Sequence, residues 1–146
     1  MRALHLTSST MYGGPERQML GLAEALRGTA EVSVASFREG GRCGAFLAEA
    51  RRRGVTAIEL RNDTPRFLSA AGEITGVLRE LKADVLLCNG YKAELLGRPA
   101  ARRAGIPAVA VSRGWTHESW KVRLYEWVER MHLRFMDRVV AVSRAQ

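Results

Sequence analysis

The 146-residue sequence has few cysteines and no long hydrophobic run, and both absences exclude whole classes of protein. Its two cysteines, Cys43 and Cys88, are far apart, so neither a disulfide-stapled scaffold nor a cysteine-based zinc site is expected. No apolar run approaches the roughly 20 residues that a membrane-spanning helix needs. The N-terminus lacks a secretory signal, because it becomes polar after about six residues. The sequence therefore favours a soluble protein of the reducing cytoplasm.

Acidic residues are also scarce relative to basic ones. The chain has 23 Lys and Arg residues against 15 Asp and Glu residues, which gives a net charge of +8. Such a surface can attract nucleic acid, anionic lipid or phosphorylated ligands, although coding bias alone can also enrich arginine. No RNA-binding aromatic strand or helix-turn-helix pattern is present, so no nucleic-acid partner is expected. The one dense basic cluster, Arg51–Arg53, favours weak contact with an anionic membrane surface.

Short apolar runs alternate with helix-like segments along the whole chain. Strands are expected at 2–7, 31–37, 56–60, 83–89, 106–112 and 138–143, and helices from Pro15 to the stop at Gly28 and at 44–53, 69–82, 91–105 and 120–136. The fourth helix is expected to be interrupted, or to start anew, near Pro99. This alternation requires parallel crossovers and predicts an α/β fold. We expect a Rossmann-like, doubly wound sheet of about six mainly parallel strands with helices on both faces.

The segment TSSTMYGGPERQMLGLAEAL, residues 7–26, is the first candidate site. Gly13 and Gly14 lack a Cβ atom, so a ligand can approach the backbone closely and φ can be positive. Pro15 suits the first position of a helix, whose N-terminal N–H groups favour an anion. Neither the G-x-G-x-x-G fingerprint nor the P-loop lysine is present. A glycine turn required only for tight strand–helix packing is the alternative.

A second loop, CNGYKAE at residues 88–94, follows a strand at the edge of the sheet where ligands bind in such folds. Asn89, Tyr91 and Lys92 offer an amide, a hydroxyl and a positive charge there. As an alternative, Asn89 is only the N-cap of the following helix.

The third loop, SRGWTHESW at residues 112–120, has the richest chemistry. Arg113 can clamp a phosphate, Trp115 can stack on a sugar, and His117 can act as a base or bind a hydroxyl. Alternatively, Trp120 begins the apolar face of the next helix. No cluster of His, Cys and carboxylate residues indicates a metal, and no nucleophile–base motif is present.

Three segments together resemble glycosyltransferase family 4, which has the GT-B architecture. The strand followed by GGPERQMLGLAEAL is similar to the opening of the family. ADVLLCNGYKAELLGRPAARRAGIPAVAVSRGW resembles its fourth strand, helix and fifth strand, and YEWVERMHLRFMDRVVAVSRA resembles its helix–Asp–strand–Ser segment. The resemblance covers essentially the whole chain, and the segments occur in the right order.

This resemblance implies retaining transfer of a hexosyl-type sugar from a nucleotide-diphosphate sugar to a glycan or lipid-linked acceptor. No cofactor and no metal are expected. Residues 1–146 would form a single N-terminal, acceptor-side domain, without the donor-binding C-terminal domain and its paired glutamates. The chain alone is therefore expected to be inactive. We expect a cytoplasmic location at the inner face of the membrane, with peripheral membrane contact. A stand-alone, non-catalytic nucleotide- or phosphate-binding module is the alternative.

The resemblance also assigns residues. The glycine pair and the acidic residue after it match the loop that approaches the phosphate and sugar of the donor. The family often carries a histidine in the loop after the fifth strand, where this chain has Arg113, with His117 four residues later. Arg113 and His117 are thus the catalytic candidates. The expected substrate-binding residues are Gly13, Gly14, Glu16, Asn89, Tyr91, Lys92, Arg113, Gly114 and Trp115.

Overall fold

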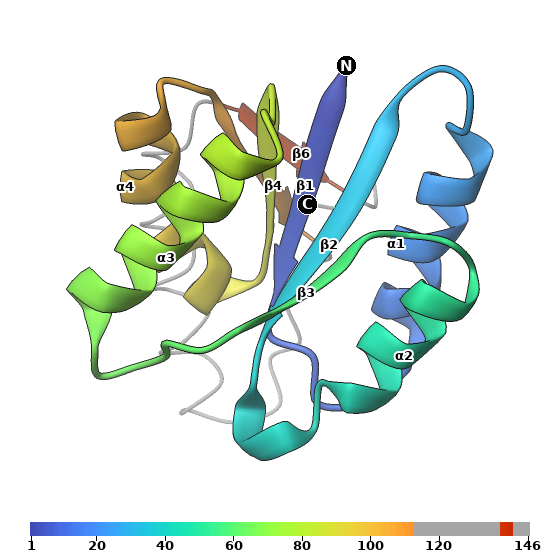
Figure 1. The fold of residues 1–146 in the computed structure, drawn as a ribbon, viewed down its shortest axis with the longest axis horizontal. Coiled ribbons are helices and arrows are strands. Elements are labelled where there is room, and N and C mark those ends of the chain that lie inside the picture. Colours follow the sequence, from blue (N-terminus) through green and yellow to red (C-terminus); the bar gives the residue numbers. More distant parts are fainter. Residues whose placement is uncertain (113–137, 142–146) are drawn as a thin grey trace.

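The computed structural model describes residues 1–112 and 138–141, which form one parallel sheet between two helical layers (Figure 1). The strand order is β3-β2-β1-β4-β5-β6. Five strands lie within residues 1–112, and the backbone of β6 extends the sheet beside β5. The elements are β1 (Arg2–Thr7), α1 (Gly14–Ala25), β2 (Glu31–Phe37), the short 3₁₀ helix η1 (Glu39–Gly41), α2 (Gly44–Arg52), β3 (Ala57–Leu60), α3 (Phe67–Glu80), β4 (Val85–Asn89), α4 (Tyr91–Ala104), β5 (Ala108–Ser112) and β6 (Arg138–Ala141). The expected α/β sheet is confirmed.

Helices cover both faces of the sheet, as the sequence predicts. Helices α1 and α2 pack on one face, and α3 and α4 pack on the other (Figure 1). Strand β2 supplies both cores, because successive side chains of a strand point to opposite faces. Val32 and Val34 lie in the cluster with α1 and α2. Ala35 and Phe37 lie in the cluster with α3 and α4.

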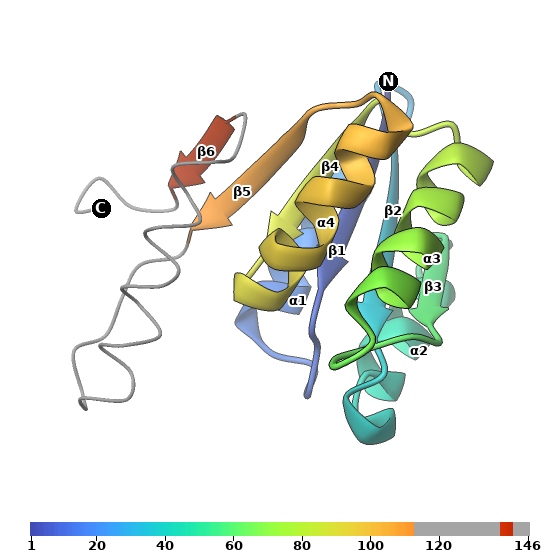
Figure 2. The same cartoon turned by 90° about the vertical axis from the view of Figure 1, so that its left-hand side faces the viewer.

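The order of the strands determines which loops can meet. The chain moves outward from β1 to β2 and β3, then crosses back to β4 on the other side of β1. The switch point therefore lies between β1 and β4. Because all pairs are parallel, the strands end at one edge of the sheet, which Figure 2 shows as a common direction of the arrows. Ligands of open α/β sheets bind at this carboxyl edge.

Helix α4 corrects one expectation. It runs from Tyr91 to Ala104 and contains Pro99 without a break. Pro99 lies on the exposed side of the helix, so its ring and the lost backbone hydrogen bond fall away from the packed face. The helix ends at Gly105, whose φ of 72° is a common left-handed helix cap. The expected interruption near Pro99 was wrong.

Within residues 1–112 and 138–141, none of the helices has both the length and the apolar character that crossing a bilayer requires.

The packing of α4 on the sheet requires a glycine at position 97. A Cβ atom there would lie 2.8 Å from Cys88 Sγ and 3.0 Å from Leu86 Cδ2. We expect Gly97→Ala to lower the free energy of unfolding by about 1–3 kcal/mol, because the extra methyl group overpacks a filled core. Urea denaturation followed by circular dichroism measures this change.

Gly76→Ala is the matched control for Gly97→Ala. Gly76 lies inside α3, and within residues 1–112 and 138–141 nothing lies within 4 Å of an added Cβ atom. This variant should be neutral or more stable by roughly 0.5–1 kcal/mol, the usual helix penalty of glycine. Equal stability of the two variants would show that α4 can move away from the sheet at little cost.

Candidate functional site

The loops that follow β1, β2, β3 and β4 lie together at the carboxyl edge of the sheet, and we call them the rim. They comprise residues 8–13, 38–43 and 61–66, and Gly90 with the first turn of α4. Of the expected site residues, the rim contains Gly13, Tyr91 and Lys92. Gly14 and Glu16 lie beside it in the first turn of α1, and Asn89 is the last residue of β4. The other candidates, Arg113, Gly114, Trp115 and His117, lie outside the described residues.

The loop after β1 ends in a helix N-terminus that is capped from within the chain. Gly13 is the N-cap of α1, and its N–H donates to Glu16 Oε2 at 3.1 Å. The sequence predicts Pro15 at the first position of this helix. In the structure α1 begins at Gly14, so Pro15 takes the second position. The buried Glu16 carboxylate occupies part of the place where an external anion was expected. Glu16 therefore shapes the loop.

Neither glycine is required by the fold at this point. Gly13 has φ of −120° and ψ of −160°, extended backbone that any residue can adopt. An added Cβ atom at Gly13 would meet Glu16 Oε2 at 3.5 Å, which is an ordinary contact. At Gly14 it would meet nothing within 4 Å among the described residues. Tight strand–helix packing thus does not explain Gly14, whose backbone has an open side.

The start of the same loop is fixed to β2. The backbone N–H of the buried Ser9 donates to Ser36 Oγ at 3.0 Å. The hydroxyl of Ser9 in turn donates to the carbonyl oxygen of Met11 at 3.0 Å. The loop is therefore held at both ends, by Ser36 at its start and by Glu16 at its end.

Asn89 is a buried link between β1 and β4. Its side-chain Nδ2 donates to the carbonyl oxygens of Leu6 and Leu87, each at 3.3 Å, and lies 3.1 Å from His5 Nδ1. The N-cap of α4 is instead Gly90, with φ of 94°, so the alternative role of Asn89 as N-cap was wrong. A pocket of about 240 Å³ adjoins this link, between α1 and the sheet, lined by His5, Gln18, Met19, Leu22, Leu87, Asn89 and Val111.

Lys92 joins three loops of the rim. Its ammonium donates to Asp63 Oδ1 at 2.7 Å and to Glu39 Oε1, and it lies 5.0 Å from the centre of the Phe37 ring. Glu39 has φ of 50°, a value that is uncommon for residues other than glycine. Burial opposes the charge of Lys92, but the hydrogen bonds that its ammonium donates to Asp63 and Glu39 outweigh this effect and raise the pKa of the ammonium. Two of its three N–H donors are thus used inside the protein.

Three acidic residues of the rim were missed in the sequence. Glu39 is the second residue after β2, Asp63 is the third residue after β3, and Glu94 is buried in the first turn of α4. The pKa of the Cys88 thiol is raised far above its usual range, mainly because the thiol is buried and secondly because the Glu94 carboxylate lies nearby. An acidic residue soon after a strand was the signal available for all three. Tyr91, at the start of α4, is partly exposed.

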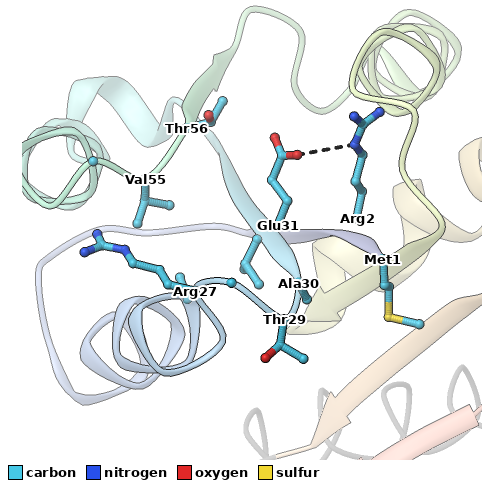
Figure 3. A pocket seen from close by; sticks show the side chains of 12 residues that line it. Met1, Arg2, Arg27, Thr29, Ala30, Glu31, Val55 and Thr56 are labelled. Atoms are coloured by element: carbon cyan, nitrogen blue, oxygen red, sulfur yellow. Dashed lines mark ion pairs between the residues drawn. The ribbon is translucent and has the colours of Figure 1, made fainter.

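A pocket of about 480 Å³ lies at the opposite edge of the sheet (Figure 3). It is formed by the start of β1 and by the turns that precede β2 and β3, with Arg2 and Glu31 in an ion pair of 3.3 Å. The amino ends of the strands surround it, far from the rim loops. Its position therefore does not favour it as the ligand site of this fold.

No group of three or more His, Cys, Asp and Glu residues in the described part of the chain has the arrangement of a metal site. The expectation that no metal takes part stays a prediction.

Comparisons with known proteins agree with this geometry. Residues 13–146 match the model of a family described as the glycosyl transferase 4-like domain. No curated protein matches the chain significantly.

Several solved structures share the fold. HepE of Anabaena in complex with UDP-glucose has a TM-score of 0.73 at 23% identity, covering 99% of this chain and 38% of HepE. A glycosyltransferase of Rickettsia africae has a TM-score of 0.73 at 16% identity, and the match covers 97% of this chain and 36% of the Rickettsia protein. MurG of Acinetobacter baumannii has a TM-score of 0.68 at 13% identity, and the match covers 98% of this chain and 42% of MurG. The chain thus spans well under half the length of these proteins.

We expect Lys92→Met to lower the free energy of unfolding by about 1–3 kcal/mol, because Glu39 and Asp63 lose a charged hydrogen-bond donor. Since the folded pKa of Lys92 is raised, its contribution is complete below the unfolded pKa of about 10.4. It is lost as the pH rises through the higher folded pKa. Urea denaturation at neutral and at strongly alkaline pH measures both effects.

Arg42→Met is the control for Lys92→Met. Arg42 is an exposed neighbour of the same Glu39, with its guanidinium 3.9 Å from the carboxylate. Exposed pairs contribute little, so this change should stay within about 1 kcal/mol. Equal effects of the two substitutions would show that Lys92 does not hold the rim loops together.

Proposed function

The chain belongs to the glycosyl transferase 4-like domain family, and on that basis we propose that it is the acceptor-side domain of a GT-B glycosyltransferase. The complete enzyme would move a hexosyl-type sugar, with retention of configuration, from a nucleotide-diphosphate sugar to a glycan or lipid-linked acceptor. The donor nucleotide would be held mainly by a second domain. The short coverage of HepE, 38% of its length, is consistent with such a domain.

The observation that carries this proposal is the open backbone at Gly14. An added Cβ atom there meets nothing within 4 Å among the described residues, so the missing side chain leaves room for an external group. The position lies at the carboxyl edge beside the switch point, where ligands of such sheets bind. A donor held by a facing domain would approach the rim at this place.

The individual side chains have different parts in this proposal. Gly13 and Gly14 face the phosphate and sugar of the donor. Tyr91 presents a hydroxyl. Lys92 has two hydrogen-bond acceptors among the described residues, so a third N–H would bind the ligand while the lysine holds the loops. Arg113 and His117 remain the candidates for contact with the reacting groups, with Gly114 and Trp115 beside them. The proposed reaction uses neither a cofactor nor a metal.

Peripheral contact with the cytoplasmic face of a membrane is also part of the proposal. Phe67 and Leu68 begin α3 at the rim with 47% and 78% of their surface exposed, directly after the exposed Arg66. Apolar and basic side chains together suit an anionic lipid surface. The cluster Arg51–Arg53 supports such contact less than its charge suggests, because Glu49 pairs with two of its arginines.

We expect the 146-residue chain alone to show no sugar transfer and to bind UDP-glucose more weakly than about 1 mM, since the proposed donor-binding domain is not part of it. The polypeptide extended beyond residue 146 by its second domain should transfer sugar. Radiolabelled transfer from a panel of nucleotide sugars and calorimetric titration measure these properties. Efficient turnover by the short chain would refute the proposal.

The same titration distinguishes the proposed transferase domain from the alternative, a stand-alone binding module. A stand-alone nucleotide- or phosphate-binding module would bind its nucleotide in the micromolar range without any second domain, and adding sequence beyond residue 146 would not produce transfer.

We expect Gly14→Ala to lower kcat/KM for the nucleotide sugar by about 10- to 100-fold in the extended enzyme, because a methyl group would displace the donor. The stability of the domain should not fall, since an added Cβ atom meets no atom within 4 Å in the part of the chain that the structure describes. Steady-state kinetics and urea denaturation measure the two quantities, with Gly76→Ala as the control. Unchanged kinetics in Gly14→Ala would show that the donor does not approach this backbone.

A further inference from the structure

Arg53 contacts the glycine loop from the far end of α2. It follows directly after α2, and its Nη2 donates to the hydroxyl of Tyr12 at 3.0 Å, across 41 residues of sequence. Tyr12 immediately precedes Gly13 and Gly14. A side chain of the basic cluster therefore contacts the loop that the proposed function places against the donor.

The guanidinium of Arg53 is itself fixed in orientation. Its Nε donates to Glu49 Oε1 at 2.8 Å, and its Nη1 lies 3.4 Å from Glu24 Oε2. Only 25% of the Arg53 side chain is exposed. Hydrogen bonds from Arg52 and then Arg53 lower the pKa of Glu49 to about 2, so the carboxylate stays charged at physiological pH. Arg53 is thus held by carboxylates of both α1 and α2.

The ring of Tyr12 has two further supports. It packs against the apolar cluster formed by α1, α2 and β2. The guanidinium of Arg17 in α1 lies 5.6 Å from the ring centre, within the range of a cation–π contact. The side chain of Tyr12 is therefore held by its hydroxyl and by its ring.

The middle of the loop depends on this tyrosine. Ser36 fixes the loop at Ser9, and Glu16 fixes it at Gly13. Between these two points, the side chain of Met11 is largely exposed, whereas that of Tyr12 is anchored. Two consecutive glycines follow, and glycine has more backbone conformations available than any other residue.

Resting on the proposed function, we propose that Arg53 is a positioning residue for the donor-facing loop and acts through Tyr12. By binding the Tyr12 hydroxyl it keeps residues 11–14 in the one arrangement that admits the nucleotide sugar. A loop released from this contact occupies several arrangements, and the apparent affinity for the donor falls by the fraction of competent loops. Arg53 itself touches no reacting atom.

Hydrogen exchange of the 146-residue chain without ligand tests the ordering of the loop. Tyr12→Phe removes only the hydroxyl, and Arg53→Lys keeps the charge but loses the fork that spans Glu49 and Tyr12. In both variants the amides of residues 11–14 should exchange about 3- to 10-fold faster, the factor that the loss of one hydrogen bond predicts. The amides of α2 should exchange at unchanged rates.

Arg52→Lys is the matched control. Arg52 also binds Glu49, at 2.6 Å, but its hydrogen bonds in the described structure do not include Tyr12. Exchange at residues 11–14 should therefore stay at the wild-type rate in this variant. Unchanged exchange in Tyr12→Phe, or equal acceleration in Arg52→Lys, would overturn the proposal.

Kinetics of the extended enzyme test the link to the donor. Tyr12→Phe and Arg53→Lys should each raise KM for the nucleotide sugar about 3- to 10-fold at unchanged kcat, and the double variant should be no worse than either single one. Faster exchange with an unchanged KM would overturn the positioning role. Absence of transfer by the wild-type extended enzyme would refute the proposed function, whereas the exchange rates would still decide whether Arg53 orders the loop.

Discussion

The parallel pairing of β1 with both β2 and β4 is the constraint on which the rest of the structure depends. Because these strands run in one direction, the loops that follow them emerge at one edge and can contact one another. The ion pairs of Lys92, the contact of Ser9 with Ser36 and the link from Asn89 to β1 all join loops or strand ends at this edge. Antiparallel pairing would separate these partners by the length of a strand.

Much of the fold could be predicted from periodicity. Alternating and continuous apolar runs identified the strands, and the spacing of apolar residues identified the helices that the structure describes. The prediction of a helix break near Pro99 was wrong, because proline is tolerated where the affected hydrogen bond faces solvent. Whether a residue faces solvent cannot be read from a short motif. Boundaries moved by a residue or a few, as at Pro15, because capping by Glu16 decided where α1 begins.

The roles of site residues could be predicted less well, because they depend on partners distant in sequence. The sequence predicts that Lys92 offers its positive charge to a ligand, but its ammonium donates hydrogen bonds to Glu39 and Asp63 from two other loops. The helix cap considered for Asn89 is not formed, because its amide donates to the carbonyl oxygen of Leu6 in β1. The reason for a glycine at a given position was equally ambiguous in the sequence. Gly97 is required by packing and Gly14 is not, a difference that only the surrounding atoms reveal.

The central position of β1 also has a consequence for synthesis. A ribosome makes β1 and β2 early, whereas β4, which pairs with the other edge of β1, is completed only at Asn89. During this interval the nascent chain has an apolar central strand with an open edge, a form that invites pairing with other chains. The chain must therefore pass through a vulnerable stage before its own fourth strand closes the sheet around β1.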